Sequence, residues 1–150
     1  MKLLKGNNPI LRQKSTNIDW NGDDFRALCK ILSHYYYVEK SEHILGCSLP
    51  QFGILKRICL CKLPVSGVTI MINPKIKFKF GFKKSQEGCE SLGGKDHQYI
   101  VRRPIIGLVE WRDESMQKHT KWFTYKSMRI IQHELDHFEG LLIDRGIKLW

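Results

Sequence analysis

The spacing of apolar residues changes its period near residue 125, and this change limits the folds open to the chain. Between about residues 54 and 124, apolar residues run together or alternate with polar ones, which is the pattern of β-strands. From Tyr125 to Glu139 they recur three and four positions apart, as on one face of a helix. Gly140 follows where a left-handed residue commonly ends a helix. Strands followed by a late helix favour an α+β fold.

Two earlier patterns complete the predicted architecture. Helical spacing over 23–39 predicts an amphipathic helix that covers a sheet. Lysines alternate with isoleucine and phenylalanines over 75–82, which predicts a strand with one apolar face and one solvated lysine face. Phosphate binding by these lysines is the alternative. We therefore expect antiparallel and mixed β-sheets packed around the late helix, with one N-terminal covering helix.

Composition bounds the class of protein. With 150 residues, 42% hydrophobic and 27% charged, the chain predicts a single globular domain over 1–150. It has no apolar run of about 18 residues and no apolar signal-peptide core, so we expect neither a membrane span nor export. Five cysteines, an odd number, then indicate free thiols in a reducing, cytoplasmic compartment. The net charge of +10 predicts attraction to polyanions such as RNA or the ribosome but names no partner.

The predicted late helix contains an H-E-x-x-H motif over 133–137. His133 and His137 lie four residues apart and share one helix face, so both imidazoles can hold one metal ion. Glu134 would then lie beside a water bound to that ion. The alternative is a helix whose histidines and glutamate only face solvent or bond locally.

A catalytic metal site typically has three protein ligands and an open position, so a third ligand is needed. Few residues follow His137, and Glu139 is too close to it in sequence. Cys89 is the better candidate, because it lies in a glycine-containing polar turn, EGCES, from which a thiolate could reach the helix. The alternative for Cys89 is a small buried apolar residue.

These motifs resemble a known family. EGCES over 87–91 and QHELDH over 132–137 are similar to the second and third motifs of the peptide deformylases. The segment 43–53 resembles the first motif in part: it keeps Gly46 and Gln51, but other positions depart from the family pattern. The flanks also agree, so the resemblance covers nearly the whole chain.

The resemblance implies a reaction, the hydrolysis of the formyl group from the formyl-methionine of nascent polypeptides. In that reaction Cys89, His133 and His137 would hold one divalent metal ion. Glu134 would act as general base and then as general acid.

The resemblance also implies groups that bind the substrate. The side-chain amide of Gln51 and the backbone N–H of Glu90 would stabilise the formyl oxygen. Gly46 would let the peptide backbone approach, and Ile130 and Arg129, which precede His133 by three and four residues, would border the methionine pocket. Core packing is the alternative for Ile130 and Arg129. We expect Glu87 to pair with Arg102 or Arg103 in a structural role.

A thiolate and two imidazoles suit Fe²⁺, Zn²⁺, Co²⁺ or Ni²⁺, and the family resemblance implies Fe²⁺ with the others as substitutes. The expected partners are N-formylmethionyl nascent peptides and the ribosome through the basic surface, without a membrane or specific DNA. The expected compartment is the cytoplasm of a bacterium or a virus-infected host, with an organelle as an alternative. Two other functions stay open: a zinc metallopeptidase, and a homologue that binds ribosomal RNA without catalysis.

Overall fold

The computed structural model describes residues 2–40 and 44–145, so His43 and the last five residues lie outside the described part. Within that part, neither helix is long and apolar enough to cross a bilayer. The elements in chain order are α1 (Phe25–His34), continued by a π-helical segment (Tyr35–Lys40), β1 (Gly46–Ser48), β2 (Ile58–Leu63), β3 (Gly67–Phe80), β4 (Lys83–Cys89), β5 (Gly94–Arg103), β6 (Ile106–Arg112), β7 (Lys118–Thr124) and α2 (Tyr125–Phe138).

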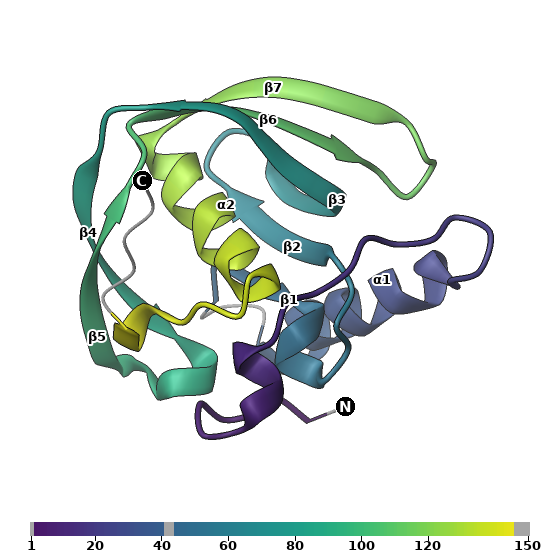
Figure 1. Ribbon diagram of the computed structural model, residues 1–150, viewed down its shortest axis with the longest axis horizontal. Coiled ribbons are helices and arrows are strands. Elements are labelled where there is room, and N and C mark those ends of the chain that lie inside the picture. The colour runs from purple at the N-terminus through teal and green to yellow at the C-terminus, as the bar shows by residue number, and fades with distance from the viewer. Residues whose placement is uncertain (1, 41–43, 146–150) are drawn as a thin grey trace.

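Strand pairing divides the chain into two sheets. One has five strands in the order β1-β2-β3-β6-β7, and the other consists of β4 and β5. Adjacent strands in both sheets are antiparallel, and within the described residues parallel pairing is limited to an isolated bridge between Thr16 and Lys56. Figure 1 shows β3 leading over the top of the molecule into β4, so that the two sheets enclose α2. The predicted α+β class, with strands around a late helix, is confirmed.

The two helices pack on opposite faces of strand β2. Ile58 and Leu60 face one side and pack in a cluster with α1, while Cys59 and Cys61 face the other side and pack with α2. All four side chains are fully buried. Residues 58–61 are covered on both faces, which is why this part of the strand is a continuous apolar run in the sequence, while Lys62, the next residue, is exposed. The predicted covering role of the N-terminal helix is confirmed.

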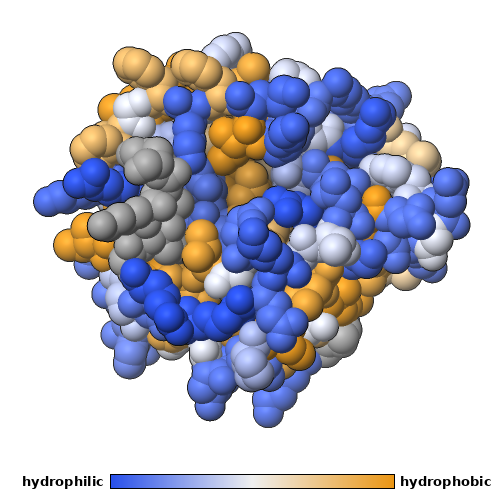
Figure 2. Space-filling view, viewed as in Figure 1, coloured by the Kyte–Doolittle hydropathy of each residue, from blue (hydrophilic) through white to orange (hydrophobic). Residues whose placement is uncertain are grey.

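The prediction of one continuous apolar face over 75–82, at the end of β3, is wrong. Ile76 lies opposite Val109, but Phe78 lies opposite the next residue of β6, Leu108, because the register shifts between Ile76 and Phe78. A bulge of this kind moves the following side chains to the other face of the sheet. Phe78 is therefore 50% exposed and Phe80 is 68% exposed, instead of sharing a buried face with Ile76. Figure 2 shows hydrophobic surface at the upper left, over the region where β3 leads into β4.

Gly140 ends α2 as predicted, with a φ of +71°. A Cβ atom there would lie 2.4 Å from the backbone oxygen of Arg12, so the position excludes a side chain both by conformation and by space.

We expect Gly140→Ala to lower the free energy of unfolding by about 2 kcal/mol or more, because it adds a steric clash to the cost of a left-handed backbone. Denaturant unfolding measures this change. Gly67→Ala is the matched control, since Gly67 has a φ of +73° but a Cβ added there would meet no atom within 4 Å. Equal losses in the two variants would contradict the steric part of the explanation.

Candidate active site

Helix α2 and the end of β4 bring three candidate metal ligands together. His133 and His137 lie on one face of α2, with ring centroids 5.5 Å apart. The Sγ of Cys89, the last residue of β4, lies 3.7 Å from Nε2 of His137. One ligand atom from each residue lies within 4.8 Å of the others. The structure thus joins the three residues that the sequence suggested as ligands, although one comes from a strand and two from a helix far along the chain.

The geometry of these three residues fits a tetrahedral metal ion. With bonds of about 2.3 Å to sulfur and about 2.0 Å to nitrogen, a tetrahedral angle separates the two ligand atoms by about 3.5 Å. The observed distance of 3.7 Å between Cys89 and His137 agrees. His133 Nδ1 lies 2.9 Å from a carboxylate oxygen of Glu87, so this nitrogen can donate a hydrogen bond while Nε2 is left for a metal.

The protonation of the two histidines differs because their surroundings differ. Burial lowers the pKa of His133, but the side chains of Cys89 and Glu87 outweigh burial and hold that pKa well above its ordinary value. Burial and the neighbouring His133 lower the pKa of His137, so its ring is neutral and can act as a ligand. The surroundings of His133 therefore favour a positive charge next to its ring. A bound metal cation can supply that charge in place of a proton.

Glu134 lies beside this triangle, with only 4% of its surface exposed. Burial raises the pKa of Glu134 to about 7, which is near the range where a carboxyl group can both accept and donate a proton at neutral pH. Its Oε2 has no hydrogen-bond partner within the part of the chain that the structure describes. A buried carboxyl group in the wall of a cleft, with hydrogen-bonding capacity that the described residues leave unused, is suited to act on a small molecule bound there.

Gly46 has a specific steric reason to be glycine. A Cβ at this position would lie 2.8 Å from the backbone oxygen of Leu60 and 2.9 Å from Oε1 of Glu134. Gly46 pairs with Cys61 in the β1–β2 ladder, which holds its backbone against the carboxylate. We expected a close approach of a peptide here, and the structure adds that the glycine also makes room for Glu134.

Gln51 is positioned by a capping interaction. Its Oε1 accepts a hydrogen bond of 2.9 Å from the backbone N–H of Ser48, across a short 3₁₀ turn over Leu49–Phe52. Its Nε2 lies 3.3 Å from Oγ of Ser91, in the turn that follows Cys89. The amide oxygen is therefore occupied, and the NH₂ group is directed toward the segment that carries Cys89 and Glu90.

A buried arginine ties the two-stranded sheet to α2. Arg103 has no exposed surface, donates to both oxygens of Glu87 at 2.8 and 2.6 Å, and donates to Asp136 at 2.6 Å. The expected pairing of Glu87 is thus formed by Arg103, while Arg102 is exposed and lies over the ring of Phe82. Asp136 was not anticipated as a partner, because its side-chain direction depends on how α2 packs against β5.

The ion pair predicts an acid-sensitive contribution to stability. Burial alone would raise the pKa of Glu87, but hydrogen bonds from Arg103 and His133 lower it to about 2, from an ordinary value of 4.5. A lowered pKa stabilises the folded chain above the ordinary value, and this stabilisation is lost as the pH falls from 4.5 toward 2.

We expect the free energy of unfolding to fall by about 3 kcal/mol more over this pH interval in the wild type than in Glu87→Gln, since glutamine does not titrate. Urea unfolding at successive pH values measures both curves. Parallel curves would show that Glu87 keeps an ordinary pKa in the folded chain.

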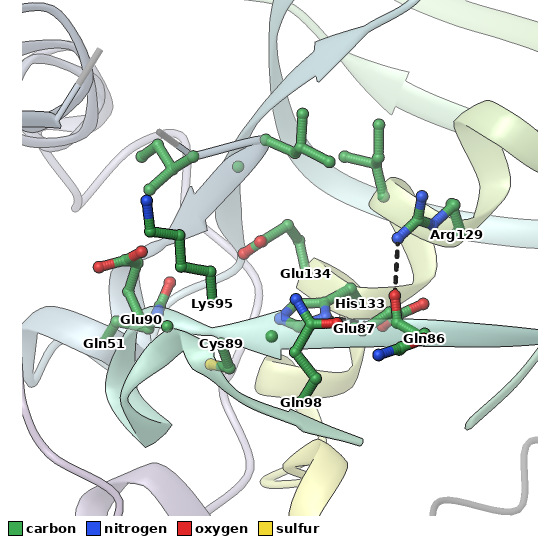
Figure 3. A pocket seen from close by; sticks show the side chains of 16 residues that line it. Gln51, Gln86, Glu87, Cys89, Glu90, Lys95, Gln98, Arg129, His133 and Glu134 are labelled. Atoms are coloured by element: carbon green, nitrogen blue, oxygen red, sulfur yellow. Dashed lines mark hydrogen bonds and ion pairs between the residues drawn. The ribbon is translucent and has the colours of Figure 1, made fainter. Parts of the chain in front are cut away.

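All the candidate residues except the fully buried His137 line one open cleft of about 210 Å³, shown in Figure 3. The three candidate substrate-binding residues all lie on it, namely Gly46, Arg129 and Ile130. Gln51, Cys89, Glu90, His133 and Glu134 also line it. Three polar residues that the sequence analysis did not single out complete the wall, namely Gln86, Lys95 and Gln98. No local pattern marks them, because they reach the cleft only through the pairing of β4 with β5.

A Cys/His/His triangle, a buried glutamate beside it and an open cleft define the class of metal-dependent hydrolases with an H-E-x-x-H helix. Comparison with known proteins identifies the family. A family model for polypeptide deformylases matches residues 1–149. The peptide deformylase of Picosynechococcus sp. is 34% identical and covers 91% of this chain and 73% of its own length, and that of Finegoldia magna is 33% identical and covers 91% and 82%.

Solved structures agree with the sequence matches. A Plasmodium falciparum peptide deformylase in complex with an inhibitor is 30% identical, with a TM-score of 0.83, and covers 99% of this chain and 90% of its own. A Synechococcus elongatus peptide deformylase in complex with actinonin is 28% identical, with a TM-score of 0.85, and covers 99% and 79%. The chain therefore belongs to the peptide deformylase family of metal-dependent hydrolases, as the motifs predicted.

Proposed function

We propose that this chain, as a single catalytic domain over 1–150, hydrolyses the N-formyl group of formyl-methionine at the start of nascent polypeptides and releases formate. The observation that carries the proposal is the position of Glu134: a buried carboxylate with a free oxygen, next to three residues that fit one metal ion, at the wall of an open cleft. Family membership supports the same reaction.

The residues around the cleft have separate tasks in this mechanism. A divalent ion held by Cys89, His133 and His137 would lower the pKa of a water and polarise the formyl oxygen. Glu134 accepts a proton from the attacking water and delivers it to the departing amine. The Nε2 of Gln51 and the backbone N–H of Glu90 donate hydrogen bonds to the formyl oxygen as negative charge develops on it.

We assign the methionine side chain to the part of the cleft bordered by Ile130, with Arg129 next to it on α2. Gly46 on β1 would provide backbone groups to an extended peptide, which binds in the manner of an added strand. Ile130 is only 8% exposed, so it offers an apolar wall without losing its place in the core.

For the cofactor we propose Fe²⁺ in cells, with Zn²⁺, Ni²⁺ or Co²⁺ as substitutes. The donor set of one thiolate and two imidazoles supports metals of this borderline class over Mg²⁺ or Ca²⁺, which prefer oxygen ligands. We further propose that the protein acts in the cytoplasm and approaches the ribosome through its positive charge, which is +10 overall.

The test is formate release from a formyl-Met tripeptide by protein prepared without oxygen and loaded with Fe²⁺. We expect a strong chelator to abolish release and Fe²⁺ to restore it, because the reaction needs the ion for its acidified water. Cleavage inside unformylated peptides would instead support a metallopeptidase. Binding of ribosomal RNA by a metal-loaded protein that releases no formate would support the non-catalytic homologue.

A further inference from the structure

Two cationic side chains of the cleft lack an anionic partner. Lys95 lies near the start of β5 and is exposed, and Arg129 lies on α2 and donates to the backbone oxygen of Gln86, at 3.1 Å. Figure 3 shows Lys95 on one side of Glu134 and Arg129 on the other. Within residues 2–40 and 44–145, neither forms an ion pair.

The carboxylates of the cleft do not cancel this positive charge. Glu87 is already paired with Arg103 and His133. Glu134 is buried and serves the proposed chemistry. Glu90 is the remaining carboxylate in the cleft wall, and its Oε1 lies toward Gly94, 3.1 Å from the position of a Cβ built there. The cleft wall therefore carries two cations, against one carboxylate that belongs neither to the Arg103 network nor to the proposed chemistry.

We infer that the cleft prefers formylated peptides with an acidic residue close behind the methionine, and that Lys95 and Arg129 create this preference. The inference rests on the proposed function and concerns its substrate class. Residues of an extended peptide are about 3.3 Å apart, so a side chain one or two positions after methionine still lies within a short cleft. Since both cations have free hydrogen-bond donors, an aspartate or glutamate there gains a charge-assisted contact that asparagine or glutamine lacks.

The preference is measured with two formyl tripeptides that differ only in charge, formyl-Met-Asp-Ala and formyl-Met-Asn-Ala. The quantity compared is the ratio of their kcat/KM values. We expect the aspartyl peptide to be favoured about fivefold at low ionic strength, which is what one close ion pair contributes in a solvated site. The ratio should approach one in about 1 M salt, because at that ionic strength the attraction between two charges is screened beyond about 3 Å.

Variants that reverse or remove one of the two charges test which residue creates the preference. Lys95→Glu should turn the ratio below one, while cleavage of the asparaginyl peptide reports that this variant is still folded and active. Arg129→Gln should reduce the ratio, and only the ratio is compared for it, because Arg129 also borders the proposed methionine pocket and its loss can lower kcat/KM for both peptides. Lys30→Glu is the matched control, because it makes the same change in net charge on α1, and we expect it to keep the wild-type ratio. Lys30 does not line the cleft.

The outcomes separate this inference from the function on which it rests. Equal kcat/KM for the two peptides at low salt, with both cleaved, would overturn the preference and leave the deformylase reaction intact. A Lys95→Glu variant with the wild-type ratio would overturn the assignment to Lys95. No formate from either peptide would refute the proposed function and the preference together.

Discussion

Glu134→Gln is expected to lower kcat for formate release by about a thousandfold, which is the usual contribution of a positioned general base and acid. Glutamine keeps the size of the side chain and its place beside Gly46, but it cannot accept the proton of the attacking water. The metal ligands Cys89, His133 and His137 are unchanged, so the variant should bind one metal ion per chain as the wild type does. Steady-state formate release and metal content measure the two quantities.

Stability distinguishes a lost base from a damaged fold. Glu134 is buried with one carboxylate oxygen unpaired, so removing its charge should leave the free energy of unfolding unchanged or raise it. Glu139→Gln is the matched control: Glu139 follows the same helix but lies at the surface, paired with Arg57 at 3.1 Å. We expect that control to retain activity. A Glu134→Gln variant within tenfold of the wild type would refute the assigned role.

Arg103→Met is expected to lower the free energy of unfolding by about 4 kcal/mol, because it leaves the carboxylates of Glu87 and Asp136 buried without their cation. For a chain of this size the loss corresponds to a melting temperature lower by about 10 °C. Methionine fills a similar volume, so the effect reports the charge more than a cavity. Denaturant unfolding and thermal unfolding measure the change.

The neighbouring arginine provides the control for that experiment. Arg102 is exposed and lies over Phe82, so Arg102→Met should cost less than about 1 kcal/mol. The destabilisation of Arg103→Met should also shrink as the pH falls, since protonation removes the charges that the variant leaves unpaired. Equal effects of the two substitutions would show that the buried network does not stabilise the fold.

Local patterns predicted the parts of the fold and site that depend on nearby residues. The helix with His133 and His137 follows from its apolar spacing, and the glycine that ends it was found from its position alone. The choice of Cys89 as the third ligand depended on the composition of its turn and on the family motifs. Its distance from His137 could not be derived, because it depends on β4 folding back over α2.

Other features depended on details that residue patterns do not carry. The bulge in β3 leaves the alternation of lysine and phenylalanine unchanged, yet it exchanges the two faces of the strand beyond Ile76. Arg102 and Arg103 are adjacent residues of the same type. Successive side chains of a strand point to opposite faces, and only the placement of β5 decides that Arg103 is the one that is buried. Lys95 and Gln98 enter the cleft through the pairing of two strands, so no local signal distinguished them from surface residues.

The separation of the sheet formed by β4 and β5 from the five-stranded sheet gives the metal site a mechanical role. Cys89 and His137 are 48 positions apart in the chain and belong to different structural units, so an ion that binds both acts as a cross-link. A cross-link of this length restricts the unfolded chain and stabilises the folded one. Loss of the ion would therefore remove one link between the small sheet and the helix, and the ion pairs of Arg103 with Glu87 and Asp136 would remain to hold that contact.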